Sequence, residues 1–185
     1  MSQISDCLDL LRQLVAIPSE SQNEEAHARF LADYLKDELE METQLHHVEG
    51  KSYNVTGCWH PIKGKARRKL MLGGHLDTVS PTDLWETDPY RLVQQGDQLH
   101  GLGSGDMKGG LAAQLMVLKS LKEQGGCGMQ RWNLWGWQMK SATRWEPMLM
   151  CGGSRRKNSH SRRPFLLWRS PTLIILLWEP QERCC

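Results

Sequence analysis

Hydrophobic residues in the first 126 positions recur with the period of amphipathic helices in three places. This spacing predicts helices over residues 3–16, 24–39 and 107–124. Pro18 ends the first of them, because proline cannot continue a helix. The residues expected on the three buried faces are Ile4, Leu8, Leu11 and Val15; Phe30, Leu31, Tyr34 and Leu35; and Leu111, Leu115, Leu118 and Leu121.

Between these helices the pattern is typical of short strands. We expect strands at 41–48, 52–59 and 69–74, and the last is an apolar run that suits a buried position in a sheet. Two shorter segments, 91–95 and 98–100, flank Gly96-Asp97 and predict a hairpin. Because helices and strands alternate along the chain, the predicted fold class is α/β.

The pattern fails after Gly126. Residues 127–185 hold six of the eight tryptophans and no Asp, and their apolar positions keep neither period for long. Residues 1–126 carry a net charge of −5 and residues 127–185 a net charge of +7. Such a split is typical of a basic tail that binds nucleic acid or a membrane.

A tail that binds nucleic acid and a tail that attaches to a membrane are therefore two alternatives, and each has its own candidate residues. Arg155-Arg156-Lys157 and Arg162-Arg163 could contact nucleic acid, although no aromatic residues are interleaved with them as a stacking platform requires. Residues 165–178 could attach to a membrane, but Arg169 and Pro171 interrupt a run far shorter than the roughly 20 residues that span a bilayer.

The six cysteines indicate a reducing compartment. They are scattered without a C-x-x-C pair, which makes a structural zinc knuckle a poor interpretation. The first residues lack the charged-then-apolar pattern of a secretion signal, so we expect a cytoplasmic protein with free thiols.

Two clusters in the first part carry side chains that suit metal chemistry. Gly74-His75-Leu76-Asp77 directly follows the apolar strand, and strand ends are where α/β proteins place ligands. Imidazole is a common zinc ligand whose second ring nitrogen is normally held by a carboxylate or carbonyl. Because residues i and i+2 of an extended segment point to the same side, the Asp77 carboxylate can orient His75.

The second cluster is the glycine-rich turn 103–110, in which Asp106 precedes the third helix. A carboxylate at this place can simply cap the helix, just as His75 can simply be a packed or exposed histidine. A carboxylate can also bridge two metal ions that polarise a carbonyl and activate a shared water. The turn has neither the dinucleotide pattern nor the Walker pattern for phosphate. Each signal is weak alone, and their combination in this order indicates a two-metal hydrolase.

In this combination the chain resembles the di-zinc family of acetylornithine deacetylase, succinyl-diaminopimelate desuccinylase, aminoacylase and glutamate carboxypeptidase. The resemblance runs from Ile17-Pro18-Ser19 through the His75 cluster to Trp85, Asp88-Pro89-Tyr90 and the segment 97–110. It covers about two thirds of this chain, and it corresponds to roughly the first third of a complete family member.

The resemblance implies an incomplete di-zinc exopeptidase-like catalytic domain, with helices packed on a mixed, mostly parallel sheet. It implies that His75 binds one zinc ion, that Asp77 serves catalysis by supporting His75, and that Asp106 bridges two Zn²⁺ ions, which Co²⁺ could replace. The implied reaction is hydrolysis of the amide bond of an N-acyl amino acid or small peptide by a homodimer, with no nucleic acid or membrane as partner. Leu102, where the family has Arg, and Gly105, where it has a side chain, leave the substrate preference open.

The family next requires a strand that ends in Asp-Glu-Glu, where one Glu is the general base and its neighbour is a zinc ligand. A further acidic ligand and a distant His complete the family's site. Residues 127–185 contain no match to these, since Glu146 has no acidic neighbour. We therefore expect the 185-residue chain to be inactive and the strand at 69–74 to have an unpaired edge or an exposed face.

The genetic code offers an explanation for the missing acidic run. Residues 136–141 require GGN-TGG-CAR-ATG-AAR and a Ser codon, taken as AGY. Displaced by one base, this string reads NTG-GCA-RAT-GAA-RAG, which permits Val-Ala-Asp-Glu-Glu and forces the Ala and the first Glu. We predict that residues 1–126 are the N-terminal portion of a zinc-hydrolase catalytic domain. Residues 127–185 are then a disordered tail, read out of frame from a point between Gln124 and Trp137; the alternative is an unusual but genuine C-terminal domain.

Overall fold

A computed structural model describes residues 3–59, 68–124, 132–140, 165–169 and 174–178. The basic clusters of the predicted tail, at 155–157 and 162–163, lie outside these residues. The helices and strands follow the chain in this order: α1 (Gln3–Ala16), α2 (Glu25–Asp37), β1 (Glu42–Glu49), β2 (Ser52–Cys58), β3 (Arg68–His75), β4 (Val93–Gln95), β5 (Gln98–His100), the irregular turn η1 (Ser104–Lys108), α3 (Gly109–Glu123), β6 (Trp132–Lys140), β7 (Phe165–Arg169) and β8 (Ile174–Trp178).

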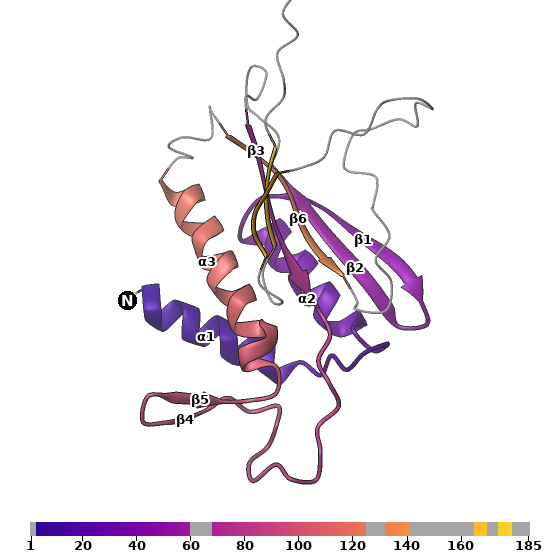
Figure 1. The fold of residues 1–185 in the computed structure, drawn as a ribbon, viewed down its shortest axis with the longest axis vertical. Helices are drawn as coiled ribbons and strands as arrows, with labels where there is room; N and C mark the ends of the chain where they lie inside the picture. Colours follow the sequence, from indigo (N-terminus) through magenta and orange to yellow (C-terminus); the bar gives the residue numbers. More distant parts are fainter. Residues whose placement is uncertain (1–2, 60–67, 125–131, 141–164, 170–173, 179–185) are drawn as a thin grey trace, which may run out of the picture.

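A mixed sheet forms the centre of the fold (Figure 1). Its six described strands lie in the order β1-β2-β6-β3-β8-β7, and β4 and β5 form a separate hairpin. Strand β3, which ends at His75, is parallel to β6 on one side and antiparallel to β8 on the other. The strand end that carries His75 therefore belongs to an interior strand of the described sheet.

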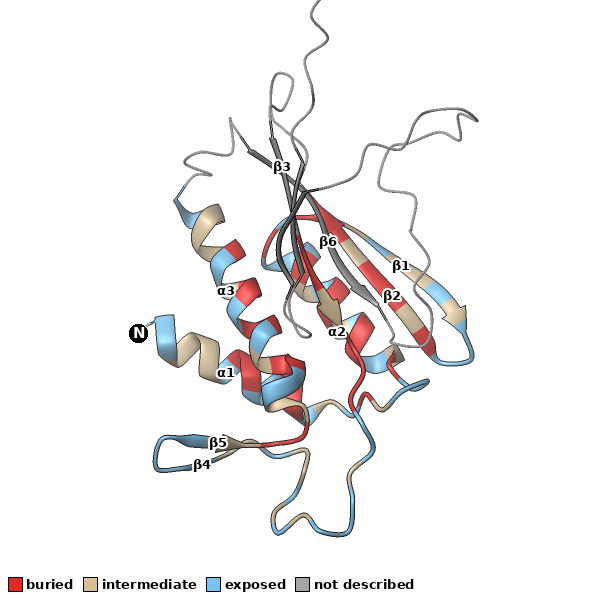
Figure 2. Ribbon diagram, viewed as in Figure 1, coloured by how far each residue is buried: buried red, intermediate tan, exposed pale blue. Residues whose placement is uncertain are grey.

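The core lies where the three helices meet the sheet, as the red segments of Figure 2 show. Leu14 of α1, Leu31 of α2 and Leu115 of α3 are fully buried, and they share one cluster with Val55 and Leu72 of the sheet. Burying each such side chain contributes about 1.5–3 kcal/mol. Packing of the helices on β2 and β3 thus fixes the position of the strand end that carries His75.

The helices agree with the predicted periodicity, and the α/β class is confirmed. The first face differs from the prediction, since Ile4 is 73% exposed and Leu8 is half-buried, while Leu10 and Leu14 are buried. The third helix begins at Gly109 instead of residue 107, because Asp106 and Met107 have non-helical backbone angles (φ −136°, ψ 97° and φ −131°, ψ 26°). None of the helices in the described ranges is both long and apolar enough to cross a bilayer.

Two expectations about the sheet need correction. We expected mostly parallel pairing, but of the five strand pairs in the described sheet β3–β6 is parallel and the other four are antiparallel. We also expected an unpaired edge on the strand at 69–74, whereas β3 is hydrogen-bonded on both sides. The partners β6 and β8 come from residues 127–185. The reading frame of residues 127–185 is a property of the gene, which the fold does not test, so the out-of-frame tail stays a prediction.

Candidate metal centre

His75 occupies the last position of β3, where the strand leaves the sheet. Its backbone N–H donates to the Met107 Sδ at 3.2 Å, which ties the strand end to the loop before α3. Its ring Nδ1 lies 2.8 Å from the backbone carbonyl O of Asp77. A carbonyl in this position accepts from Nδ1–H and leaves Nε2 with its lone pair directed away, as in histidines that bind metals.

Asp106 reaches this nitrogen from the other cluster. Its Oδ1 lies 2.8 Å from the His75 Nε2, although the two residues are 31 positions apart. Asp106 does not cap the helix, which was the alternative interpretation. The N-cap of α3 is Lys108, and it makes no side-chain cap hydrogen bond. The structure thus brings together the two residues that the sequence predicted as metal ligands.

The charges around His75 favour a positive ring when no metal is present. The side chain of Asp77 raises the pKa of His75 most, burial opposes this, and Asp106 raises it further, so that the pKa is about 9. The Asp106 side chain is 67% exposed and the His75 side chain 27% exposed. A cation that approaches from solvent therefore meets a carboxylate and an imidazole that are already aligned, and its binding must displace the ring proton.

Asp77 supports His75 in a different way from the one we predicted. Its carboxylate Oδ1 lies 3.5 Å from the His75 Nδ1, too far for a good hydrogen bond, while its backbone carbonyl makes the contact. Asp77 is buried, and its Oδ2 accepts a 2.7 Å hydrogen bond from the Ser21 hydroxyl. The carboxylate thus stands beside the ring, where it raises the pKa of His75, and through Ser21 it holds the loop in place.

The loop before Asp106 depends on Gly103. This glycine has φ +75°, a left-handed conformation, and a Cβ there would lie 2.5 Å from the Thr78 Cγ2. We predict that Gly103→Ala lowers the free energy of unfolding by about 1–3 kcal/mol, because left-handed strain and a clash with a buried side chain act together. Urea denaturation measures this. Gly105→Ala is the matched control, since its Cβ would meet nothing within 4 Å; equal losses in both variants would contradict the prediction.

His27 lies beneath the strand end and is fully buried, with Nδ1 3.0 Å from the Leu76 carbonyl O. Burial, then the positive charge of Lys108, lowers the pKa of His27 to about 3. Because the unfolded chain binds this proton near pH 6.5 and the folded chain does not, the free energy of unfolding should fall between pH 6.5 and 3, by up to about 1.4 kcal/mol per pH unit.

His27→Asn tests this pH dependence, since an Asn amide can still donate to the Leu76 carbonyl without taking up a proton. Thermal unfolding followed by circular dichroism across this range should show a flatter pH dependence for the variant than for the unchanged chain. Parallel curves for the two proteins would show that another group causes the acid sensitivity.

The donor set fits part of a zinc site. His75 Nε2 and Asp106 Oδ1 are donors of the kinds that zinc takes, while zinc sites use three or four protein ligands. The described residues contain no group of three or more His, Cys, Asp or Glu side chains placed to hold a metal ion. The two ligands therefore need further donors from outside the described side chains.

The register of β6 shows where further donors could come from. Since β6 runs parallel to β3, both strands end at the same edge of the sheet. Lys140 is the Cα partner of His75, and Met139 is the partner of Gly74. The segment that, in our prediction, a displaced reading frame would convert into an acidic run therefore ends beside His75.

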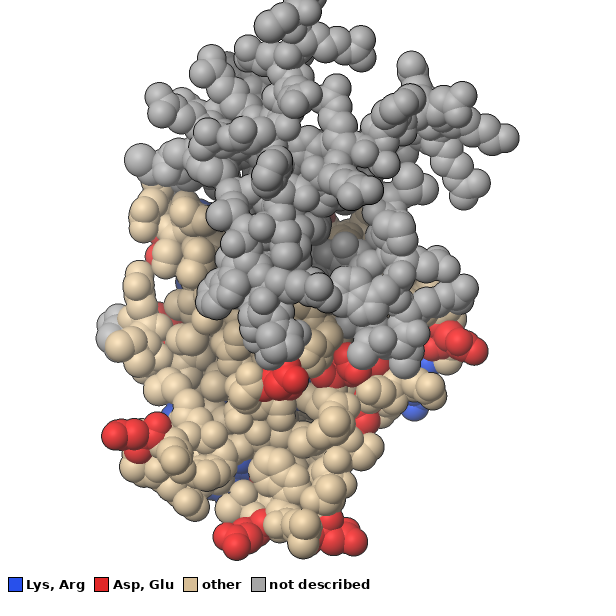
Figure 3. All heavy atoms as spheres, in the orientation of Figure 1, with Lys and Arg blue, Asp and Glu red and all other residues tan. Residues whose placement is uncertain are grey.

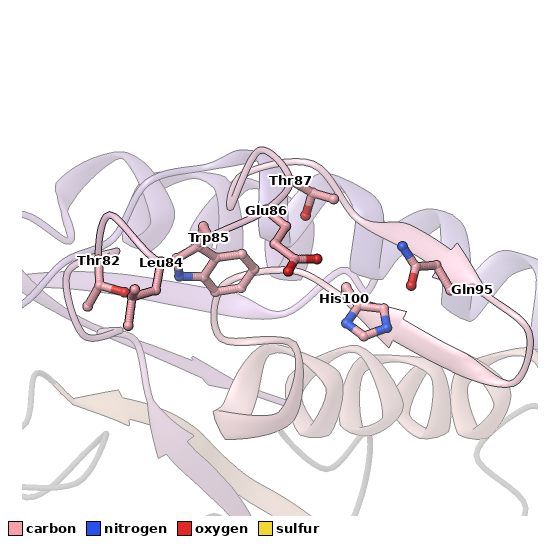
Figure 4. A pocket seen from close by; sticks show the side chains of 7 residues that line it. All are labelled: Thr82, Leu84, Trp85, Glu86, Thr87, Gln95 and His100. Atoms are coloured by element: carbon pink, nitrogen blue, oxygen red, sulfur yellow. The ribbon is translucent and has the colours of Figure 1, made fainter.

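A shallow pocket of about 250 Å³ lies elsewhere, between the loop after β3 and the β4–β5 hairpin (Figure 4). Neither His75 nor Asp106 lines it. Its lining residues are Thr82, Leu84, Trp85, Glu86, Thr87, Gln95 and His100. The pocket is separate from the candidate metal centre.

Sequence reasoning missed three residues that organise the centre: Ser21, Met107 and Lys108. Met107 contacts the backbone of His75, and Ser21 holds the carboxylate of Asp77. The position of Met107 and Lys108 directly after Asp106 was a usable signal, since both residues belong to the same glycine-rich turn. Ser21 gave no signal, because its partner is 56 positions away.

Comparison with known proteins shows what this chain is similar to. Residues 71–127 match the model of Peptidase family M20/M25/M40. Succinyl-diaminopimelate desuccinylase of Blochmanniella floridana is 33% identical over 122 residues, which cover 63% of this chain and 30% of that protein. A probable succinyl-diaminopimelate desuccinylase of Staphylococcus aureus (strain MRSA252) is 34% identical over 122 residues, which cover 63% of this chain and 28% of that protein. The chain thus spans about 30% of the length of the curated relatives it matches.

Two solved structures share the fold. Human carnosine dipeptidase 1 has a TM-score of 0.60 at 20% identity and covers 74% of this chain, with 32% of its own length matched. A tripeptidase from Staphylococcus aureus subsp. aureus Mu50 has a TM-score of 0.54 at 21% identity, with 75% of this chain and 36% of that chain covered. Residues 71–127 are therefore similar in sequence to the M20/M25/M40 peptidases, and the fold of this chain is similar to the folds of these two structures.

Proposed function

We propose that this chain derives from a zinc-dependent hydrolase that cleaves the amide bond of an N-acyl amino acid or a small peptide. The observation that carries the proposal is the 2.8 Å approach of the His75 Nε2 and the Asp106 Oδ1 at the end of β3. The relatives support the reaction class, since they are described as desuccinylases. The two solved structures with a similar fold are described as a dipeptidase and a tripeptidase.

The chain's own residues have distinct roles in this proposal. His75 is a ligand through Nε2, which the Asp77 carbonyl keeps available by accepting from Nδ1–H. Asp106 offers two carboxylate oxygens on an exposed side chain, so that each can serve one ion of a pair. When bound, two zinc ions, or cobalt in their place, polarise the substrate carbonyl and activate water.

The proton-transfer group is missing from this chain and is supplied, we propose, by the displaced reading frame. There the codons that span Gln138 to Ser141 permit Asp-Glu-Glu, and β6 ends beside His75 in the sheet. A Glu at this edge is close to the metal ligands and can serve as general base. The gene product with an intact frame is thus proposed to be active and the 185-residue chain inactive, with residues 127–185 as an out-of-frame tail.

The remaining features rest on the family resemblance. We propose a cytoplasmic homodimer that acts on a small-molecule substrate. Binding of nucleic acid by the basic tail is the alternative, and its clusters lie outside the described residues. Acidic side chains are spread over the described part of the face in Figure 3, where few basic ones are visible, so phosphate binding is not favoured on that part.

The test is a hydrolysis assay of the gene product with an intact frame. The panel holds N-succinyl amino acids, N-acetyl amino acids and dipeptides, each with added zinc and after chelation. We expect zinc-dependent cleavage of one class and none after chelation. Cleavage that persists without metal, or none of any class by folded and zinc-loaded protein, would refute the proposal.

A further inference from the structure

Lys108 is the largest of the fully buried side chains in the described part of the chain, with 1% of its surface exposed. Lysine is almost never fully buried unless its charge is compensated. Its Nζ donates a 2.8 Å hydrogen bond to the backbone carbonyl O of Ile17, a residue 91 positions earlier. A buried cation at this place costs stability, so its position calls for a structural reason.

Ile17 begins a segment that is attached to the loop after His75. The backbone N–H of Thr78 donates to the Ser19 carbonyl O at 2.8 Å, and the N–H of Ser21 donates to the Thr78 carbonyl O at 3.2 Å. The Ser21 hydroxyl holds the carboxylate of Asp77. The segment 17–21 is therefore fixed to the residues that orient the His75 ring.

The opposite end of Lys108 is attached to the loop that carries Asp106. The backbone N–H of Lys108 donates to the Gly103 carbonyl O at 2.8 Å, so this residue closes the loop that contains Asp106. Asp106 itself has a non-helical backbone and a mostly exposed side chain, so neither the helix nor the core holds it. Two buried residues follow Asp106: Met107, whose Sδ accepts from the His75 N–H, and Lys108, which lies where the start of α3 meets the end of α1 (Figure 1).

The surroundings of Lys108 have opposing effects on the pKa of its amine. Burial lowers the pKa of Lys108 to about 8, and the Glu20 carboxylate opposes this effect. The Tyr90 hydroxyl donates to the Glu20 Oε1, which holds that carboxylate in position. Either form of the amine can donate to Ile17, so the bond does not depend on the charge.

We propose that Lys108 is a positioning residue whose buried bond to Ile17 fixes the Asp106 carboxylate against the His75 ring. The contact between the two ligands exists without a metal, and its dependence on Lys108 can be measured in the metal-free chain. The effect on zinc binding rests in addition on the proposed function.

The experiment compares Lys108→Met with Lys122→Met. Lys122 is a matched control, because its Nζ also donates to a backbone carbonyl, that of Glu38, at 2.8 Å, but far from the centre. Long-range ¹H–¹⁵N spectra of the histidine rings are recorded on the metal-free chain at one fixed pH. The Asp106→Asn variant serves as the reference, because it gives the His75 signal expected when the contact between His75 and the Asp106 carboxylate is lost. We expect Lys108→Met to move the His75 signal toward that reference, Lys122→Met to leave it unchanged, and Lys108→Arg to restore most of it.

Zinc titration of the same substitutions in the gene product with an intact frame gives a second measurement. We expect Lys108→Met to bind zinc at least about 10-fold more weakly than the Lys122→Met control. An unchanged His75 signal in folded Lys108→Met, or an equal change in Lys122→Met, would overturn the proposal. If the Met variant does not fold, Lys108→Arg decides: a His75 signal like that of Asp106→Asn would contradict it, and a native signal would support it. Absence of zinc binding by the gene product with an intact frame would count against the proposed function alone, since the ring spectra need no metal.

Discussion

Restoring the reading frame ahead of Trp137 is expected to convert an inactive chain into a zinc-dependent amidohydrolase. The displaced frame supplies a Glu at the end of β6, beside His75, where this chain has Met139 and Lys140. A general base contributes about 10²–10⁴ in rate, and the neighbouring acidic ligand also tightens the metal. We therefore predict at least that difference in kcat/KM between the frame-restored protein and the 185-residue chain, measured on the same N-acyl substrate with zinc.

A single substitution controls for the added length of the restored protein. Changing the Glu encoded by the forced GAA codon to Gln should return activity to near the level of the 185-residue chain while the fold is retained. Zinc-dependent turnover by the purified 185-residue chain, above that of a mock preparation, would contradict the prediction.

Removing either of the two converging ligands is expected to abolish productive zinc binding. Substitutions that disturb only the support of a ligand typically cost 10- to 100-fold in affinity. We therefore expect His75→Ala and Asp106→Asn each to weaken zinc binding by more than about 100-fold in the frame-restored protein. Competition with a chromophoric chelator measures this.

Asp97→Asn is the matched control for the loss of charge, since Asp97 is an exposed carboxylate in the β4–β5 turn. It should bind zinc like the unchanged protein. Affinity retained within a few-fold in Asp106→Asn would place the metal elsewhere.

The sequence predicted the local elements well because their signal is local. The helical period of α1 and α2 and the strand before His75 each follow from neighbouring residues. The start of α3 was predicted two residues early, at Met107, because the apolar pattern includes this residue although its backbone angles (φ −131°, ψ 26°) are non-helical. At this position the contacts of the site, and not the local helix propensity, determine the backbone conformation.

What the sequence could not predict depends on contacts between distant residues. The pairing of β3 with β6 and β8 joins segments that are far apart along the chain, and no turn between them reveals the register. The support of His75 by the Asp77 carbonyl, in place of its carboxylate, depends on backbone direction alone. Lys108 was visible as a residue type, but only the fold shows that its bond ends at Ile17.

The central claim is that His75 and Asp106 are ligands of a shared metal centre. Anomalous diffraction at the zinc edge, from crystals of the frame-restored protein grown with zinc, tests it most directly. We predict a zinc ion about 2.0–2.2 Å from both the His75 Nε2 and an Asp106 carboxylate oxygen, inserted where the two now touch. Zinc bound only at other residues, with the direct contact between His75 and Asp106 intact, would contradict the claim.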